Sequence, residues 1–463
     1  MKSLLCLFCW IVFCAGWAQD ALPYFIHPEK SFRYRVYFTD KKNSHFSLRH
    51  PEAFLSPKAL ERRRKLKIKV DEYDLPVSPP YLKYLSQQGF KIHNCSKWNN
   101  TAVIETTDST LVRKLQAITF VQQVKKVWES PDSVLVYPKD DRHKIVENLR
   151  YEQDSLYGDG YAQAAMLNVP RLHQQGLMGK GVSIAVIDGG FYNADCIAGL
   201  SPCHILGTKN FVHPNVGVYE EPQQHGTMVL SCMAAQLPNY MVGTAPDAFY
   251  YLLVSEDNES EHLVEEDNWC AALEHADSLG VDLVTTSLGY CDFDNPNDRY
   301  QYRDLNGETA LNSRSASMAA SRGILLISSA GNEGSGTWKK ITFPADAKAI
   351  LTVGAVNVQQ QNADFSSVGN TADNRIKPDV MAMGEDVAVL NCYGNLTFAN
   401  GTSFSAPILC GGIACLLQAF PLETPTSLIE VIRQTGDRTD HPDNIYGFGI
   451  PDLWKAYNLL KSK

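Results

Sequence analysis

The sequence predicts an α/β protein with a mostly parallel central sheet, preceded by a small α+β domain. Two observations predict this arrangement. From about Gln163 onward, short apolar segments alternate with helical stretches, which is typical of a parallel sheet with helices on both faces. Before residue 140, strands with alternating polarity and short helices are separated by turn signals. A polar, charged stretch at 131–157 separates the two parts and indicates an exposed connection.

The first 18 residues have the pattern of a signal peptide. Lys2 precedes the apolar run from Leu4 to Phe13, and the small residues Gly16 and Ala18 precede an expected cut. Cys14 would allow a lipoprotein, but the bulky Phe13 before it disfavours that alternative. We therefore expect an exported protein, whether secreted, periplasmic or associated with the cell envelope. The apolar stretch 406–420 carries two glycines and is interpreted as a buried core helix, so no stable membrane span is expected.

Residues 19–140 are expected to form the α+β domain. Ser56-Pro57 is a good helix start, with a serine cap and a proline in the first turn. Residues 141–162 are assigned to the linker and maturation region, and residues 163–463 to the main domain. The expected strands of the first domain are 32–38, 102–105 and 121–127, and its expected helices are 57–66, 81–88 and 109–115.

In the main domain, the expected strands are apolar on both faces, as strands of a covered parallel sheet should be. They are 182–187, 249–254, 283–287, 324–328 and 351–356. The expected helices are the one after His225 and those at 268–279, 316–322 and 406–420; the acidic run 261–267 is interpreted as the exposed start of a helix.

Composition is ordinary for a globular protein, with 44% hydrophobic and 20% charged residues, but the charge is unevenly distributed. Residues 21–140 hold 21 Lys and Arg against 12 Asp and Glu, a net charge of +9, and residues 141–463 hold 20 against 38, a net charge of −18. This difference predicts two domains that attract each other. Nucleic-acid binding is disfavoured because the basic residues are scattered. The single dense cluster, at 62–65, is interpreted as a solvated helix face.

Cysteine usage adds little to the functional interpretation. The spacing of the cysteines matches no zinc finger. Cys232, Cys410 and Cys415 stand among apolar residues and are interpreted as buried free thiols.

Three short motifs carry candidate chemistry, and each has an ordinary alternative. Asp188 ends an apolar strand, where ligands are expected in an open α/β sheet, although such residues are often turn residues. His225 begins an apolar helical run, where a histidine is often a cap. Ser403 lies at the start of another helix, whose field favours a developing negative charge. The three motifs together favour nucleophilic catalysis over these alternatives.

The order Asp, His, Ser and the surrounding motifs resemble the subtilisin family. The α/β-hydrolases use the order Ser, Asp, His, and Ser405 breaks their Gly-x-Ser-x-Gly pattern. The sedolisins have glutamate in place of the histidine and an aspartate as the oxyanion donor. Because this chain has His225 and Asn332 instead, the subtilisin family is preferred. Further family signatures are Gly243-Thr-Ala-Pro246, Lys377-Pro-Asp-Val-Met-Ala-Met-Gly384, Ser329-Ala330-Gly331-Asn332 and Ser287-Leu288-Gly289, and the resemblance covers about 163–455.

The resemblance implies a subtilisin-like three-layer fold and a secreted serine endopeptidase, made as a self-processing precursor, that acts on protein or peptide substrates as a monomer. It implies that residues 19–140 are a propeptide that inhibits the active site intramolecularly. It also implies site roles: a catalytic triad of Asp188, His225 and Ser403, an oxyanion-hole donor in Asn332, and substrate-binding residues Ser287, Leu288, Gly289, Ala330 and Gly331.

Two residues depart from the family pattern. Gly189 stands where the family usually has Ser or Thr after the catalytic Asp, so a possible hydrogen-bonding side chain is missing. Tyr290 stands where many relatives have glycine, and it is expected to fill part of the primary specificity pocket.

No cofactor is expected. Calcium is common in the family, but the acidic loop 292–298 lacks the glycine and the terminal glutamate of an EF-hand, so a solvated loop is preferred over a calcium site.

Two other functions are possible for such a scaffold: non-catalytic binding and exopeptidase activity. A non-catalytic binding protein would usually lose a member of the triad, whereas this chain keeps Asp188, His225 and Ser403. An exopeptidase would need a blocked cleft, which a sequence does not reveal.

Overall fold

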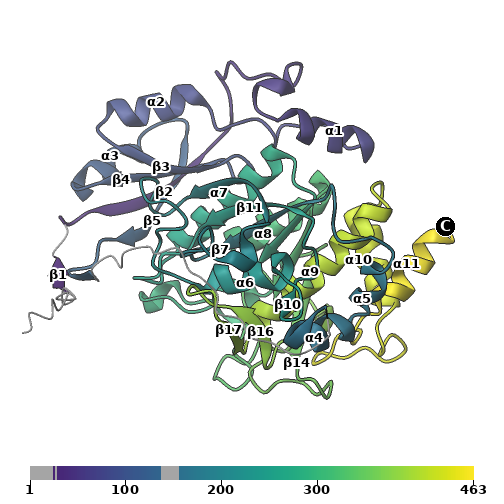
Figure 1. The fold of residues 1–463 in the computed structure, drawn as a ribbon. Helices are drawn as coiled ribbons and strands as arrows, with labels where there is room; N and C mark the ends of the chain where they lie inside the picture. The colour runs from purple at the N-terminus through teal and green to yellow at the C-terminus, as the bar shows by residue number, and fades with distance from the viewer. Residues whose placement is uncertain (1–23, 27–28, 137–155) are drawn as a thin grey trace, which may run out of the picture.

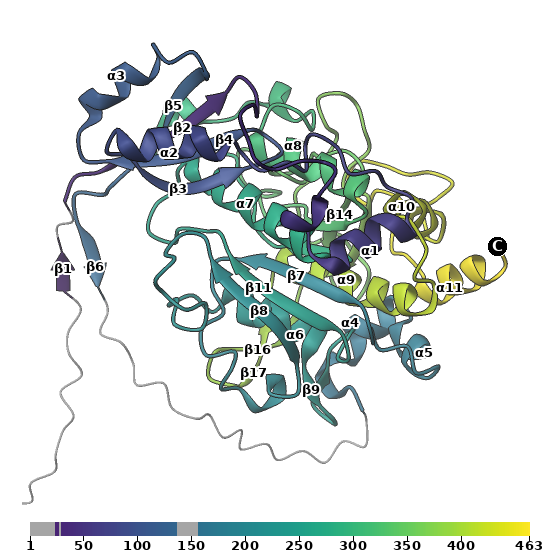
Figure 2. The ribbon, with the colours of Figure 1, turned by 90° about the horizontal axis from the view of Figure 1, so that it is seen from above.

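The computed structural model describes residues 24–26, 29–136 and 156–463. Figures 1 and 2 show its ribbon from two directions. The expected signal peptide, 1–18, lies outside the described residues, as does the part of the expected linker from 141 to 155.

The N-terminal domain is a four-stranded antiparallel sheet with helices packed on one face. The strand order is β3-β4-β2-β5, and Leu85 of α2 packs in a core with Val36 and Ile104 of the sheet. The elements are β2 (Phe32–Phe38), α1 (Pro57–Lys65), α2 (Pro79–Gln87), β3 (Lys91–Ser96), β4 (Thr101–Thr106), α3 (Val112–Leu115) and β5 (Val121–Glu129). Ser56 caps α1, since its hydroxyl accepts a hydrogen bond from the Ala59 amide at 3.1 Å.

The main domain is built on a seven-stranded sheet of order β15-β14-β13-β12-β7-β11-β8. Every pairing between neighbours is parallel, as expected. Strands β8 and β11 lie on one side of β7 and strands β12 to β15 on the other, so the strand order reverses at β7. The strands are β7 (Ser183–Asp188), β8 (His204–Asn210), β11 (Phe249–Val254), β12 (Leu283–Thr286), β13 (Leu325–Ser329), β14 (Leu351–Val356) and β15 (Val380–Met383).

Helices cover both faces of this sheet and produce three layers (Figure 1). Ile184 and Val186 of β7 pack in a core with α6 (His225–Ala234) and α9 (Thr402–Ala419). Ala185 and Ile187 point to the other face, where they pack with α7 (Val264–Leu279) and α8 (Leu311–Ala319). Smaller elements are α4 (Tyr161–Met166), α5 (Val169–His173), α10 (Pro425–Gln434), α11 (Leu453–Lys461), and the pairs β1 (Tyr24–Ile26) with β6 (Val134–Val136), β9 (Gln236–Leu237) with β10 (Met241–Val242), and β16 (Val387–Leu390) with β17 (Leu396–Ala399).

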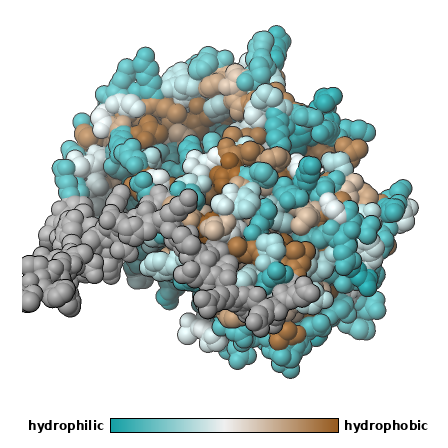
Figure 3. Space-filling view, in the orientation of Figure 1, coloured by the Kyte–Doolittle hydropathy of each residue, from teal (hydrophilic) through white to brown (hydrophobic). Residues whose placement is uncertain are grey.

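Helix α9 is a core helix, as expected. It is long and apolar enough to cross a membrane, but 89% of its apolar window is buried inside the protein. Buried Cys410 and Cys415 on α9, and Cys232 on α6, have free thiols, and burial raises their pKa. On the face shown in Figure 3, hydrophobic residues are interrupted by hydrophilic ones.

The N-terminal sheet lies over α7, and this contact corrects two interpretations of the sequence (Figure 1). Glu265, Glu266 and Asp267 are buried rather than exposed. Arg35 of β2 binds Asp267 through two contacts of 2.6 and 2.7 Å, whereas Glu265 accepts a hydrogen bond from the Asp257 amide at 3.0 Å. In the cluster 62–65, Arg62 and Arg63 are buried in the interface rather than solvated, whereas Arg64 and Lys65 are exposed as expected. Both errors concern charges that are buried by a partner distant in sequence.

Candidate active site

Three elements bring Asp188, His225 and Ser403 to one edge of the sheet. Asp188 is the last residue of β7, His225 the first of α6, and Ser403 the second of α9. Helices α6 and α9 contact each other, and the His225 ring lies 6.0 Å from the ring of Phe404, next to Ser403. Parallel strands end at this edge, and the strand order reverses at β7, which is where an α/β sheet forms a ligand crevice.

Asp188 and His225 form a direct pair. His225 Nδ1 lies 2.7 Å from Asp188 Oδ1, and the Asp188 side chain is fully buried. Burial by itself would lower the pKa of His225, but the charge of Asp188 and the hydrogen bond to it outweigh burial and raise that pKa. The pair therefore fixes the imidazole orientation and stabilises its protonated form.

Ser403 is held beside the segment that follows β12. Its hydroxyl donates to the Ser287 carbonyl at 3.3 Å, and the Ser287 hydroxyl donates to the Ser403 carbonyl at 2.8 Å. Within residues 156–463, no hydrogen bond joins Ser403 and His225 directly. The serine hydroxyl lies at the first turn of α9, in the positive field of the helix.

The orientation of Asn332 is fixed by its neighbours. Its Oδ1 accepts hydrogen bonds from the Thr402 amide at 2.9 Å and from the Thr402 hydroxyl at 3.0 Å. Because the backbone amide can only donate, the oxygen of the Asn332 side chain must face it, and Nδ2 is left as a donor. A Cβ at Gly401 would lie 3.5 Å from this Nδ2, so the amide group faces the start of α9.

The expected substrate-binding segments lie beside these residues. Gly289 is exposed, whereas Leu288, Ala330 and Gly331 are buried. The Thr342 amide donates to the Ala330 carbonyl at 3.1 Å. A Cβ at Gly289 would meet the Thr342 hydroxyl at 2.1 Å, so glycine is required for this close approach.

One oxygen of the Asp188 carboxylate is unsatisfied beside Gly189. The Gly189 amide donates to Asp188 Oδ1 at 2.8 Å, but the buried Oδ2 finds no hydrogen-bond partner among the described residues. Above Gly189, the Asn258 side chain donates to the Gly189 carbonyl at 3.1 Å and accepts from Gln223 at 3.0 Å. Gln223 in turn accepts from the His225 amide at 3.2 Å, so a polar chain links the residue after Asp188 to His225.

Tyr290 is 1% exposed, and its backbone pairs with Phe343 through two hydrogen bonds of 2.9 Å. Its hydroxyl donates to Glu256 at 3.4 Å. Burial, followed by the charges of Glu261 and Asp188, raises the pKa of Glu256 to about 8. Sequence reasoning missed Glu256, although it lies two residues after Val254, the partner of Asp188 in the β11–β7 register.

The acidic loop 292–298 is engaged by basic residues. Asp292 accepts from Arg299 at 2.7 Å, and Asp298 pairs with Lys125 of the N-terminal domain at 3.4 Å. Across 24–26, 29–136 and 156–463, no group of three or more His, Cys, Asp or Glu side chains is placed to hold a metal ion.

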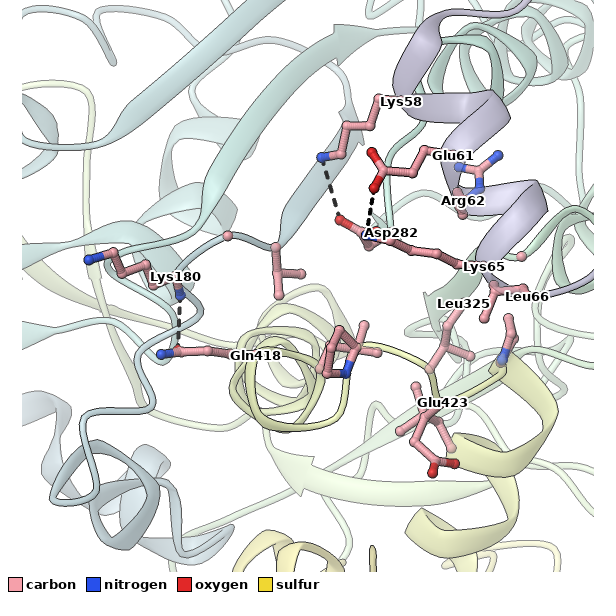
Figure 4. Close-up of a pocket in the computed structure, with 17 residues that line it drawn as sticks. Lys58, Glu61, Arg62, Lys65, Leu66, Lys180, Asp282, Leu325, Gln418 and Glu423 are labelled. Atoms are coloured by element: carbon pink, nitrogen blue, oxygen red, sulfur yellow. Dashed lines mark hydrogen bonds and ion pairs between the residues drawn. The ribbon is translucent and has the colours of Figure 1, made fainter.

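A cavity of about 230 Å³ lies at the opposite edge of the sheet, between α1 and the main domain (Figure 4). Lys58, Asp282 and Gln418 are among its lining residues. It is separate from the edge where Asp188 lies, because Asp282 directly precedes β12 at the start of the parallel strands.

Known proteins resemble both parts of the chain. Residues 179–449 match the subtilase family model, Peptidase S8, and residues 33–141 match the Peptidase S8 propeptide domain of Bacteroidota. Subtilisin NAT of Bacillus subtilis subsp. natto is 30% identical over 376 residues, which cover 80% of this chain and 84% of that protein. Subtilisin E of Bacillus subtilis strain 168 has the same identity and coverage.

Solved structures share the fold. MycP1 with its N-terminal propeptide removed has a TM-score of 0.51 and 24% identity, and the match covers 64% of this chain and 96% of that chain. The prenylagaramide maturation protease PagA has a TM-score of 0.51 and 21% identity over 64% and 99% of the two chains. The subtilase family model matches more than half of the chain, and subtilisin NAT is 30% identical to it over 80% of its length. The chain therefore belongs to the subtilase family and is a serine endopeptidase that carries a propeptide domain before its peptidase domain.

Proposed function

We propose that the chain is an exported precursor that cuts itself and then hydrolyses peptide bonds with Asp188, His225 and Ser403. The observation that carries the proposal is the 2.7 Å contact between Asp188 and His225, made at the end of β7 beside the start of α9. A buried carboxylate paired with an imidazole near a serine hydroxyl is the arrangement that activates a weak nucleophile.

In the proposed mechanism, the Ser403 hydroxyl turns from the Ser287 carbonyl towards His225 and attacks the scissile carbonyl. His225 takes the hydroxyl proton on Nε2 and later gives it to the leaving amine. Asp188 holds Nδ1 and stabilises the imidazolium. The acyl-enzyme is then hydrolysed by water through the same groups.

The proposed oxyanion hole consists of Asn332 Nδ2 and the Ser403 backbone amide. Thr402 supports this role because it engages the other end of the Asn332 amide, which orients the donor before substrate binds. Loss of the Asn332 donor is expected to lower kcat about 10²–10³-fold, the size found for the corresponding donor in subtilisin.

The proposed substrate lies along 287–289 and 330–331 as an extended peptide. The exposed backbone of Gly289 supports this placement, since extended peptides are bound through main-chain hydrogen bonds at strand edges. The propeptide would occupy this cleft until it is cut within the linker and maturation region, and export would follow from the signal sequence at 1–18.

The test compares two serines on the same helix. Wild-type protein is expected as a precursor near 51.5 kDa and as a shorter mature form. Ser403→Ala should remain full length and fail to hydrolyse casein. Ser405→Ala is the matched control, since the buried Ser405 hydroxyl only donates to the Thr402 carbonyl at 2.9 Å, and this variant should still process itself. A Ser403→Ala protein that processes itself would contradict the proposal.

A further inference from the structure

Helix α1 of the propeptide reaches the sheet edge opposite the proposed active site. Lys58 Nζ donates to the Ser183 hydroxyl at 2.6 Å, and Lys58 also pairs with Asp282 at 3.6 Å (Figure 4). Ser183 and Asp188 are the first and last residues of β7, so they lie about 17 Å apart along the strand. The propeptide therefore holds the peptidase at a place that the catalytic residues do not reach.

Two adjacent arginines of α1 are buried at this place. Arg62 is 6% exposed and Arg63 is 2% exposed. Arg62 donates to Asp277 Oδ1 at 2.6 Å and to the Val281 carbonyl. Arg63 donates to Asp277 Oδ1 at 2.9 Å and, on the propeptide side, to Asp74 Oδ1 at 2.8 Å.

Asp277 is the centre of this contact. Lys97, from the loop after β3, adds a third cation at 2.8 Å from Asp277 Oδ2. Burial alone would raise the pKa of Asp277, but Lys97, Arg62 and Arg63 hold it well below its usual value. All three cationic partners of the buried Asp277 carboxylate belong to the propeptide. Without the propeptide, this carboxylate would lose those partners, and water would have to solvate its charge.

The main chain of the peptidase also fits α1 closely. A Cβ at Gly280 would lie 2.4 Å from the Ala59 amide nitrogen, and a Cβ at Gly323 would lie 2.8 Å from Leu66. These glycines end α7 and the short helix 320–322, so the peptidase presents bare backbone where the propeptide approaches.

We propose that Asp277, Gly280, Val281 and Gly323 form a separate docking site for the Arg62–Arg63 pair, here called the arginine dock, which keeps the propeptide bound after the chain is cut between the domains. A cut in the linker breaks one covalent connection and leaves the contacts of the arginine dock unchanged. Withdrawal of the cut end from the active-site cleft also leaves them unchanged, since the dock lies at the other edge of the sheet. The proposal rests on the propeptide assignment and not on self-processing.

The experiment uses the full chain with Ser403→Ala and an inserted recognition site for an external protease within 141–150. After external cutting, size-exclusion chromatography over a dilution series measures the dissociation constant of the propeptide. Arg62→Ala with Arg63→Ala is compared with Arg64→Ala with Lys65→Ala. Both double variants remove two positive charges from α1, but Arg64 and Lys65 are exposed, and Lys65 pairs with Glu61 in the same helix.

The cut chain is expected to stay together, and the Arg62–Arg63 variant should dissociate with a constant raised about 10²-fold or more. The Arg64–Lys65 control should change the constant less than tenfold. Equal effects of the two double variants would overturn the proposal, and so would release of the wild-type propeptide on cutting.

A second measurement covers the case in which the Arg62–Arg63 variant does not fold. Hydrogen exchange on the externally cut Ser403→Ala chain, with Arg62 and Arg63 unchanged, should show the amides of α1 protected as strongly as those of β2. Free exchange in α1 with a protected β2 would show that the dock opens after cutting and would refute the proposal. Because the cut is external, failure of self-processing would not affect either measurement.

Discussion

The carboxylate of Asp188 is supported on one oxygen only. Oδ1 receives His225 and the Gly189 amide, whereas Oδ2 is buried without a hydrogen-bond partner among the described residues. Each added donor would stabilise the negative charge and weaken its pull on the imidazole proton. Because His225 is the side chain that binds Asp188, the charge of Asp188 acts mainly on His225, which agrees with the raised pKa of that histidine.

This raised pKa predicts the acid limb of the pH profile. The proposed base must be neutral, so kcat/KM should fall as the pH decreases through the pKa of His225, with a midpoint above the ordinary value of about 6.5. Asp188→Asn removes the main cause of the increase, so the midpoint should move down while kcat falls about 10⁴-fold. Initial rates on a short peptide substrate between pH 5 and 9 test both statements. A wild-type midpoint below 6.5 would contradict the electrostatic argument.

The candidate site was predictable from sequence where each residue belongs to a local motif. Asp188 ends an apolar strand, and His225 and Ser403 begin helices, so the strand and helix pattern predicts where each residue lies. Their assignment to one site came from the three motifs together and from the resemblance to the subtilisin family. Glu256 was missed because its contact with Tyr290 joins the segments after β11 and β12, which are neighbours of β7 only in the folded sheet. Sequence order carries no signal for such a contact.

At the scale of elements, the C-terminal end of α7 depends on Gly280 in two ways. Its φ of 85° disfavours any residue with a side chain, at a cost of about 1 kcal/mol, and its bare Cα admits the backbone of α1. In the precursor, Gly280→Ala should therefore lower the free energy of unfolding by more than the backbone strain.

Gly176 provides the control for this prediction. It has a φ of 73°, and a Cβ there would meet nothing within 4 Å, so Gly176→Ala measures the strain alone. Urea unfolding of the precursor should rank Gly280→Ala as clearly more destabilising than Gly176→Ala. In the mature peptidase after removal of the bound propeptide, which contains α1, the two variants should differ little. An equal effect in the precursor would show that α1 yields to the added methyl group.

The elements found from sequence are those with a strong local pattern. Strands β11 and β14 match their expected ranges because both are apolar runs bounded by turns. Strands β3 and β8 were missed because polar residues dominate both and neither shows a regular alternation of polar and apolar residues, and each lies at the edge of its sheet. The acidic start of α7 looked exposed because Arg35, which covers it, lies far away in the sequence.

At the scale of the whole molecule, the opposite charges of the two domains meet across α7. The expected attraction is present as specific ion pairs, among them Arg35 with Asp267 and Lys97 with Asp277. The net charges of the two domains predict an attraction but do not identify these buried pairs. The remaining exposed charges keep the domains oppositely charged at longer range.

This division of charge predicts how salt affects the binding of the cut propeptide. Long-range attraction speeds association and is screened beyond about 10 Å at 0.1 M salt, whereas the buried pairs around Asp277 are screened much less. Raising NaCl from 0.02 to 0.5 M should therefore slow association by about tenfold and change dissociation little. Relaxation of the externally cut Ser403→Ala chain after dilution gives both rates.

Arg64→Ala with Lys65→Ala should reduce the salt dependence of association, since it lowers the propeptide charge without touching the buried pairs. If salt instead accelerated dissociation with association unchanged, the ion pairs around Asp277 would be accessible to solvent ions, which would contradict their burial in the interface.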